Sequence, residues 1–104
     1  MVYELRLIPG CPHGASALEL FRAALAAEGQ DSEHVAVREV VSENEARALR
    51  FHGSPSFMAA GRDLLPAESA PALSCRLYRS DDGVAGLPSA ASLRAALRYG
   101  GSGA

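Results

Sequence analysis

The sequence predicts a single α/β domain in which a mixed sheet of about four strands has helices on both faces. The first observation is length, because 104 residues suffice for one compact hydrophobic core. The second is composition, since 48% apolar and 21% charged residues argue against intrinsic disorder. The third is the order of the segments, which alternate as β-α-β-α-β-β-α. We expect a parallel βαβ unit at the start and an antiparallel pair of strands later.

The first half of the chain supplies two strands and two helices. Residues 2–8 alternate apolar and polar side chains, which predicts a strand, and Pro9-Gly10 ends it. Apolar side chains recur at helical spacing over residues 15–28, and the valine-rich residues 34–41 predict a second strand. The Ser-x-x-Glu spacing of a capping box then predicts a short helix over residues 43–50.

The second half supplies two more strands and the last helix. Residues 56–60 form a short apolar strand, residues 61–63 a turn and residues 64–72 a surface loop. Residues 73–79 alternate again and predict the fourth strand of the sheet. Ser89 is the expected N-cap of the last helix.

Two charged residues fit poorly in the first strand, because a central strand of an α/β sheet is buried on both faces. These residues are Glu4 and Arg6. The second predicted helix is short and covers only part of one face. We therefore expect both side chains to contact water.

Charge and cysteine content exclude several classes of function. A formal charge of −2 and a pI near 5.9 give no reason to expect nucleic acid or an acidic membrane as partner. No apolar run is long enough to span a bilayer, and no segment resembles a signal peptide. All 10 basic residues are arginine, which we attribute to codon bias and which removes lysine Schiff-base chemistry. Two cysteines, Cys11 and Cys75, are too few for a secreted disulfide scaffold, so we expect a cytoplasmic protein.

Two short motifs precede predicted elements. Cys11-Pro12-His13-Gly14 lies between the first strand and the first helix, and Ser54-Pro55 directly precedes the third strand. With the element order, these motifs make nearly the whole chain similar to the thioredoxin-like superfamily. The resemblance implies one thioredoxin-like domain at residues 1–99, followed by a flexible tail at residues 100–104. It also implies a cis peptide bond before Pro55.

A narrower similarity concerns three stretches: Gly-Ser-Pro, Cys-Arg-Leu-Tyr-Arg and Asp-Gly. They resemble small bacterial thioredoxin-like proteins labelled as related to alkylmercury lyase. The pair Pro-His inside the cysteine motif is that of the oxidising, disulfide-forming bacterial branch. Gly14, however, stands where dithiol members of the superfamily keep their second, resolving cysteine. The resemblance therefore implies a monothiol protein.

Cys11 and His13 are the predicted catalytic residues. Cys11 lies just before the first helix or in its first turn, where unpaired amides and the helix dipole stabilise a thiolate. A protonated His13 would add to this stabilisation, and Pro12 suits the first helical position because it lacks only an unused amide. No metal site is expected, because Cys11 and His13 supply two ligands whereas structural zinc takes about four.

Ser54 and Pro55, together with Pro12, are the predicted substrate-binding residues. From the resemblance, a cis bond at Pro55 would turn the backbone of Ser54 toward Cys11. The amide and carbonyl of Ser54 would then pair with an extended thiol substrate, as in the addition of a strand.

Cys75 is the candidate for an internal resolving thiol. It has the same parity as Leu73 and Leu77 in the predicted fourth strand, which places it on the apolar face as a small core residue. We favour this core position over a disulfide between Cys11 and Cys75, which requires Cα atoms within about 7 Å.

The first functional hypothesis is a monothiol thioredoxin-like protein that performs thiol-disulfide exchange through Cys11. Its partner would be a protein thiol or a small-molecule thiol, with no cofactor other than a low-molecular-weight thiol. One alternative is a non-catalytic thioredoxin-like binding module that uses the groove beside Pro55. Another is capture of a soft metal or an organomercurial by the Cys11 thiolate. The sequence gives no oligomeric state.

Overall fold

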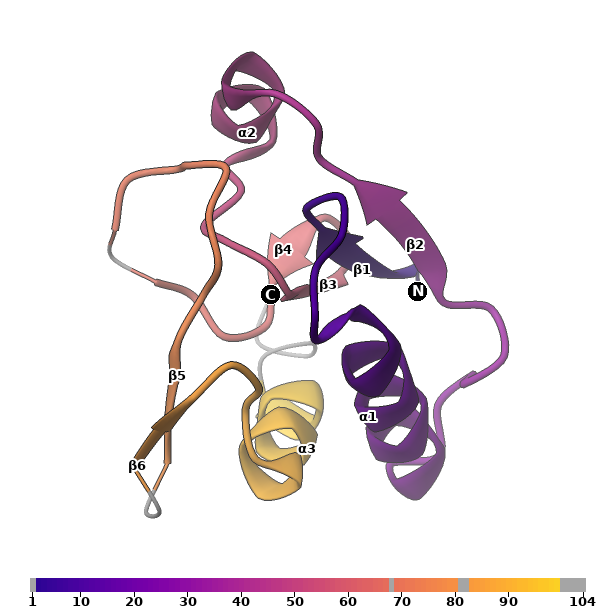
Figure 1. Ribbon diagram of the computed structural model, residues 1–104. Coiled ribbons are helices and arrows are strands. Elements are labelled where there is room, and N and C mark those ends of the chain that lie inside the picture. Colours follow the sequence, from indigo (N-terminus) through magenta and orange to yellow (C-terminus); the bar gives the residue numbers. More distant parts are fainter. Residues whose placement is uncertain (1, 68, 81–82, 100–104) are drawn as a thin grey trace.

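The computed structural model describes residues 2–67, 69–80 and 83–99, which form three helices and six strands (Figure 1). The predicted α/β class is confirmed, since a mixed sheet is combined with helices. The predicted tail at residues 100–104 lies outside the described residues. In the described part, no helix is both long and apolar enough to cross a bilayer.

Four strands form one mixed sheet in the order β2-β1-β3-β4. The central strand β1 (Tyr3–Leu7) is parallel to β2 (Ala36–Glu39) and antiparallel to β3 (Ser56–Ala59). Strand β3 is in turn antiparallel to β4 (Arg62–Asp63). The first three strands lie inside their predicted ranges, and the expected parallel pair at the start is confirmed.

The fourth strand of the sheet is not the predicted one. Strand β4 lies in the segment that was expected to be a turn at residues 61–63. Ala60 and Gly61 have φ values of 50° and 79°, and they join Ala59 to its partner Arg62 as a two-residue hairpin loop. Positive φ at both loop residues is typical of a type I′ turn, which connects antiparallel strands directly.

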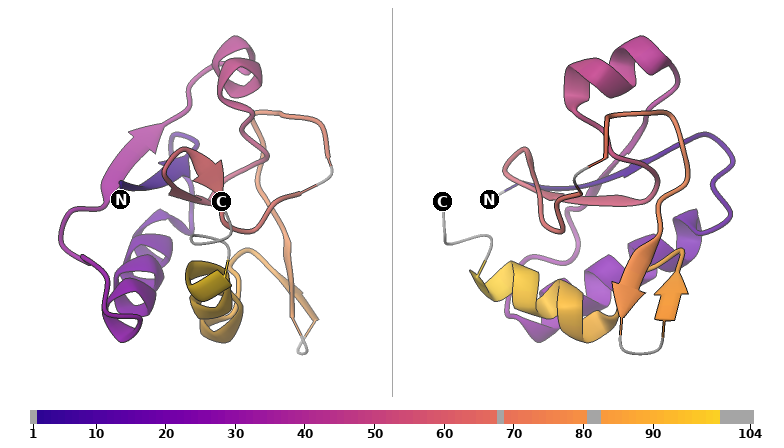
Figure 2. Two further views of the ribbon diagram at one scale, coloured as in Figure 1. Left: turned by 180° about the vertical axis from the view of Figure 1, so that it is seen from behind. Right: turned by 90° about the vertical axis from the view of Figure 1, so that its left-hand side faces the viewer.

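The segment at residues 73–79, predicted as the fourth strand, does not enter this sheet. Its end belongs to β5 (Tyr78–Ser80), which pairs with β6 (Gly83–Ala85) in a separate two-stranded sheet. Figures 1 and 2 show this hairpin to one side of the main sheet, close to the start of the last helix.

The helices cover both faces of the sheet, as predicted. Helices α1 (Gly14–Ala27) and α3 (Ala90–Tyr99) lie together on one face, and α2 (Glu43–Leu49) lies on the other (Figures 1 and 2). The larger core lies beneath α1 and α3. There the rings of Phe21 and Phe57 meet edge to face, with centroids 5.2 Å apart.

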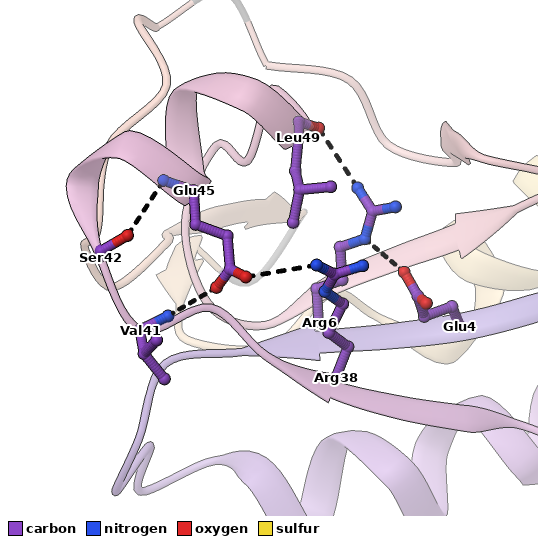
Figure 3. Close-up of polar contacts among 7 residues, drawn as sticks. All are labelled: Glu4, Arg6, Arg38, Val41, Ser42, Glu45 and Leu49. Carbon is purple, nitrogen blue, oxygen red and sulfur yellow. Dashed lines mark hydrogen bonds and ion pairs between the residues drawn. The ribbon is translucent and has the colours of Figure 1, made fainter.

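The predicted caps of α2 and α3 are present. The Ser42 hydroxyl accepts a hydrogen bond from the Glu45 amide at 3.1 Å (Figure 3). The Glu45 carboxylate reaches back past the N-cap and accepts from the Val41 amide at 2.9 Å, one residue before the amide that a capping box uses. At α3 the Ser89 hydroxyl accepts from the Ser92 amide at 3.1 Å.

Glu4 and Arg6 are not left in water, contrary to expectation. The Arg6 guanidinium pairs with the Glu4 carboxylate, and its Nη1 donates to the Leu49 carbonyl at 3.2 Å (Figure 3). The Arg6 side chain is only 11% exposed. The carboxyl end of α2 thus covers this charged pair, because Arg6 supplies a donor to an otherwise unpaired helix carbonyl.

Candidate functional site

Cys11, the predicted catalytic thiol, lies in a turn that leads from β1 into α1. The Cys11 amide donates to the Ile8 carbonyl, and the Gly14 amide donates to the Cys11 carbonyl, both at 3.2 Å. His13 has φ −102° and ψ 5°, the values typical of the third residue of a type I turn. Pro12 is the second residue of this turn, where its fixed φ is favoured. It therefore precedes the helix rather than occupying the predicted first helical position.

The proline motif lies at the same end of the sheet. The Ser54–Pro55 peptide bond is cis, as the resemblance implies. Arg6 is paired with Ser56, so the end of β1 and the start of β3 lie side by side. The loop that holds Cys11 and the loop that holds Pro55 therefore lie at the same end of the sheet (Figures 1 and 2).

His13 is half-buried beside a glycine that precedes α3. A Cβ atom placed on Gly86 would lie 2.4 Å from Nε2 of His13, so a side chain at this position would require the ring to move. His13 is also the N-cap residue of α1, and its side chain makes no capping hydrogen bond. The structure thus shows what the ring packs against. Its predicted influence on Cys11 stays a prediction.

The core position predicted for Cys75 is wrong, because Cys75 is an exposed free thiol. Its neighbours show the same reversal of parity. Leu77 is 71% exposed, whereas Arg76 and Tyr78 are 7% exposed each. Over residues 75–78 the chain therefore turns Arg76 and Tyr78 inward and leaves Cys75 and Leu77 exposed.

Buried pairing explains the reversal. Nη1 of Arg76 lies 2.7 Å from the Asp63 carboxylate, and its guanidinium stacks over the Tyr78 ring at 4.6 Å. The Tyr78 ring also meets Phe57 edge to face, and its hydroxyl donates to the Pro55 carbonyl. Burial raises the pKa of the Tyr78 hydroxyl well above its ordinary value. An arginine with a carboxylate and an aromatic ring as partners can be buried where hydropathy alone predicts exposure.

Residues 72–76, which we call the strap, run parallel to the segment before Pro55. The Ser54 amide donates to the Ser74 carbonyl at 2.8 Å, and the Arg76 amide donates to the Ser54 carbonyl at 2.9 Å. Cys75 is thus paired with Ser54 in an isolated parallel bridge. The two backbone groups of Ser54 that were expected to receive a substrate are already bonded within the chain.

One sequence signal could have indicated the strap. Gly53 has φ +114°, and a Cβ atom at this position would lie 2.9 Å from Cβ of Arg76. A glycine beside a proline motif can mark a place where another backbone segment approaches closely. The partner segment itself could not be identified from Gly53 alone.

The Ser54 side chain offers little to a partner. Ser54 is 1% exposed, and its hydroxyl has no hydrogen-bond partner among the described residues. Pro12 is exposed and Cys11 is partly exposed. The accessible part of this site is therefore the turn that holds the thiol.

Metal ligands do not gather here. Among the described residues, no three His, Cys, Asp or Glu side chains are arranged to hold an ion.

Comparison with known proteins gives no relative. No family model, curated protein or solved structure matches this chain. The resemblance to the thioredoxin-like superfamily therefore stays an expectation from the sequence motifs.

Proposed function

We propose that the chain is a monothiol thioredoxin-like protein that exchanges disulfides through Cys11. The observation that carries this proposal is the position of Cys11 in the turn before α1, at the same end of the sheet as the cis Pro55. The thiol is partly exposed, so a disulfide can reach its sulfur from solvent.

A thioredoxin-like arrangement of the chain is part of the proposal. It is supported by β1 lying parallel to β2 and antiparallel to β3, with the cis proline directly before β3. It is also supported by the connection between β1 and α1, because the loop that joins them contains Cys11.

The proposed reaction balances without an added oxidant. The Cys11 thiolate attacks one sulfur of a disulfide, a new S–S bond forms, and the other half leaves as a thiolate that takes a proton from water. A second thiolate then attacks the mixed disulfide and releases Cys11. Because Gly14 replaces a resolving cysteine, the second thiol comes from outside the chain.

Pro12 and His13 support the thiol in this proposal. Pro12 fixes the turn that carries Cys11, and His13 joins this turn to the segment before α3 through its packing on Gly86. Both residues therefore act by positioning the thiol and by setting its surroundings.

The test uses a Cys75→Ser variant, in which Cys11 is the only thiol. Intact-mass spectrometry follows its reaction at pH 6 with bis(2-hydroxyethyl) disulfide, and an unstructured cysteine peptide serves as the reference. We expect Cys11 to react about tenfold faster than the peptide if it is the exchanging thiol that the sequence predicts. Added 2-mercaptoethanol should then release the mixed disulfide.

A rate equal to that of the peptide would overturn the proposal and favour the non-catalytic binding module. A variant with both Cys11→Ser and Cys75→Ser is the control and should gain no mass. Mass spectrometry of protein isolated from cells adds an independent check. A small thiol retained on Cys11 supports exchange, whereas a retained soft metal favours thiolate capture.

A further inference from the structure

We propose that the strap restricts Cys11 to low-molecular-weight disulfides and denies it extended polypeptides. This inference rests on the proposed exchange reaction and names its substrate class. It starts from Ser54, whose backbone would be the pairing site for a substrate strand. The strap already occupies that site.

Both backbone groups of Ser54 are hydrogen-bonded to the strap. A residue has one backbone donor and one principal backbone acceptor to offer a neighbouring strand. The amide of Ser54 is bonded to Ser74 and its carbonyl to Arg76, so both are used. The Ala72 amide also donates to the Phe51 carbonyl at 3.0 Å, which extends the pairing toward α2. A peptide could add here only by displacing the strap.

Side chains hold the strap at both ends. At one end the Glu43 carboxylate accepts from the Leu73 amide at 3.3 Å. At the other, the buried guanidinium of Arg76 pairs with Asp63 at 2.7 Å. Displacing the strap would expose this ion pair or separate it, and separating a buried pair is strongly unfavourable. The strap is therefore a fixed part of the site.

A small disulfide does not need the occupied backbone. Cys11 stays partly exposed in its turn, and the adjacent Pro12 is exposed. A molecule consisting of little more than the reacting sulfurs can reach the thiol without pairing to Ser54. Substrate size is thus the property that this geometry selects.

The test compares two probes on the Cys75→Ser variant, whose strap backbone is unchanged. One probe is bis(2-hydroxyethyl) disulfide, and the other is an unstructured peptide whose central cysteine carries the same hydroxyethyl disulfide. Each rate is divided by the rate at which a free cysteine peptide attacks the same probe. We expect the normalised rate to be about tenfold lower for the peptide probe, since it gains no backbone bonds and meets the strap.

Weakening the strap should reduce this preference for the small disulfide. Asp63→Asn removes the ion partner of Arg76 and should raise the normalised peptide rate several-fold without changing that of the small disulfide. Asp31→Asn makes the same substitution at an exposed residue, so it is the matched control and should change neither rate. Amide hydrogen exchange of the Cys75→Ser protein adds a measurement that needs no strap variant. The Ser54 and Arg76 amides should both exchange slowly.

Two results would overturn the inference and leave the proposed function intact. One is a peptide probe that reacts as fast as the small disulfide on Cys75→Ser. The other is a Ser54 amide that exchanges as in an unstructured chain. If neither probe reacts faster with Cys11 than with the reference peptide, the proposed function itself fails.

Discussion

Replacing Asp63 with asparagine tests the buried ion pair that holds the strap. The substitution keeps the shape of the side chain and an oxygen for the Leu65 amide, which donates to Asp63 at 2.9 Å. It removes only the charge that faces Arg76, and the two side chains are 13% and 6% exposed. Breaking a buried pair by removing one partner costs about 3–5 kcal/mol. We expect a loss of this size, against a total of about 5–15 kcal/mol for a domain.

Urea unfolding followed by circular dichroism measures the loss. The midpoint should fall while the slope of the unfolding free energy against urea stays constant, because the same surface is exposed. The midpoint temperature of thermal unfolding should fall by about 12 °C or more. The double variant Asp63→Asn with Arg76→Met should recover most of the loss, since it removes the unpaired charge. A loss below about 1 kcal/mol, or no recovery in the double variant, would refute the reasoning.

Three further predictions concern the site and α2. In a Cys11→Ser variant, iodoacetamide should modify Cys75 in the folded protein as fast as in urea, because this thiol is exposed. Gly86→Ala should displace the half-buried His13 ring and cost about 1 kcal/mol in urea unfolding, since the ring must move to admit the Cβ atom. The pKa of Glu45 is lowered by the Val41 amide bond, so NMR titration should place it below 4.5. Its stabilising contribution is full above that value and is lost as the pH falls through the lowered pKa.

Each of these outcomes has its own control. Slow modification of Cys75 that urea accelerates would return it to the core. In a His13→Ala background the added methyl group of Gly86→Ala should cost almost nothing, and an unchanged cost would locate the clash elsewhere. Glu45→Gln should remove the share of the acid-dependent stability that Glu45 contributes and leave that of other carboxylates such as Asp31. A profile unchanged by that substitution would contradict the role of the Glu45 carboxylate.

Local patterns predicted most of the fold. Alternation of apolar and polar residues identified β1, a short apolar run identified β3, and the Ser-x-x-Glu spacing of Ser42 and Glu45 located the start of α2. These features depend on neighbours within a few residues, so the sequence contains the information directly. The turn at Ala60-Gly61 was missed because alanine seldom adopts a positive φ and so gave no hairpin signal.

Long-range pairing accounts for the main error. Residues 73–79 were assigned by hydropathy, which counts arginine as exposed and leucine as buried. Arg76 is buried because Asp63 lies across from it, and that aspartate belongs to β4, an unexpected strand. Once Arg76 and Tyr78 turn inward, Cys75 must face the other way. No pattern within residues 73–79 could reveal this.

The candidate site likewise has one part that the sequence predicted and one part that it did not. The placement of Cys11 at the same end of the sheet as the cis proline followed from the motifs and their positions in the element order. The strap was not predicted, since Gly53 can mark a close approach of backbone but does not identify the segment, about 20 residues later, that pairs with Ser54. Sequence reasoning therefore located the thiol and misjudged what surrounds it.

At Arg6 and Arg76 the structure uses properties of arginine that lysine lacks. Arg6 uses separate nitrogens for the Glu4 carboxylate and the Leu49 carbonyl. Arg76 combines an ion pair with a flat stack on an aromatic ring. A lysine ammonium is a single point charge that can neither span two separated acceptors nor stack in this way. Codon usage can explain why arginine is abundant in this chain, yet at these two positions an exchange for lysine would not be conservative.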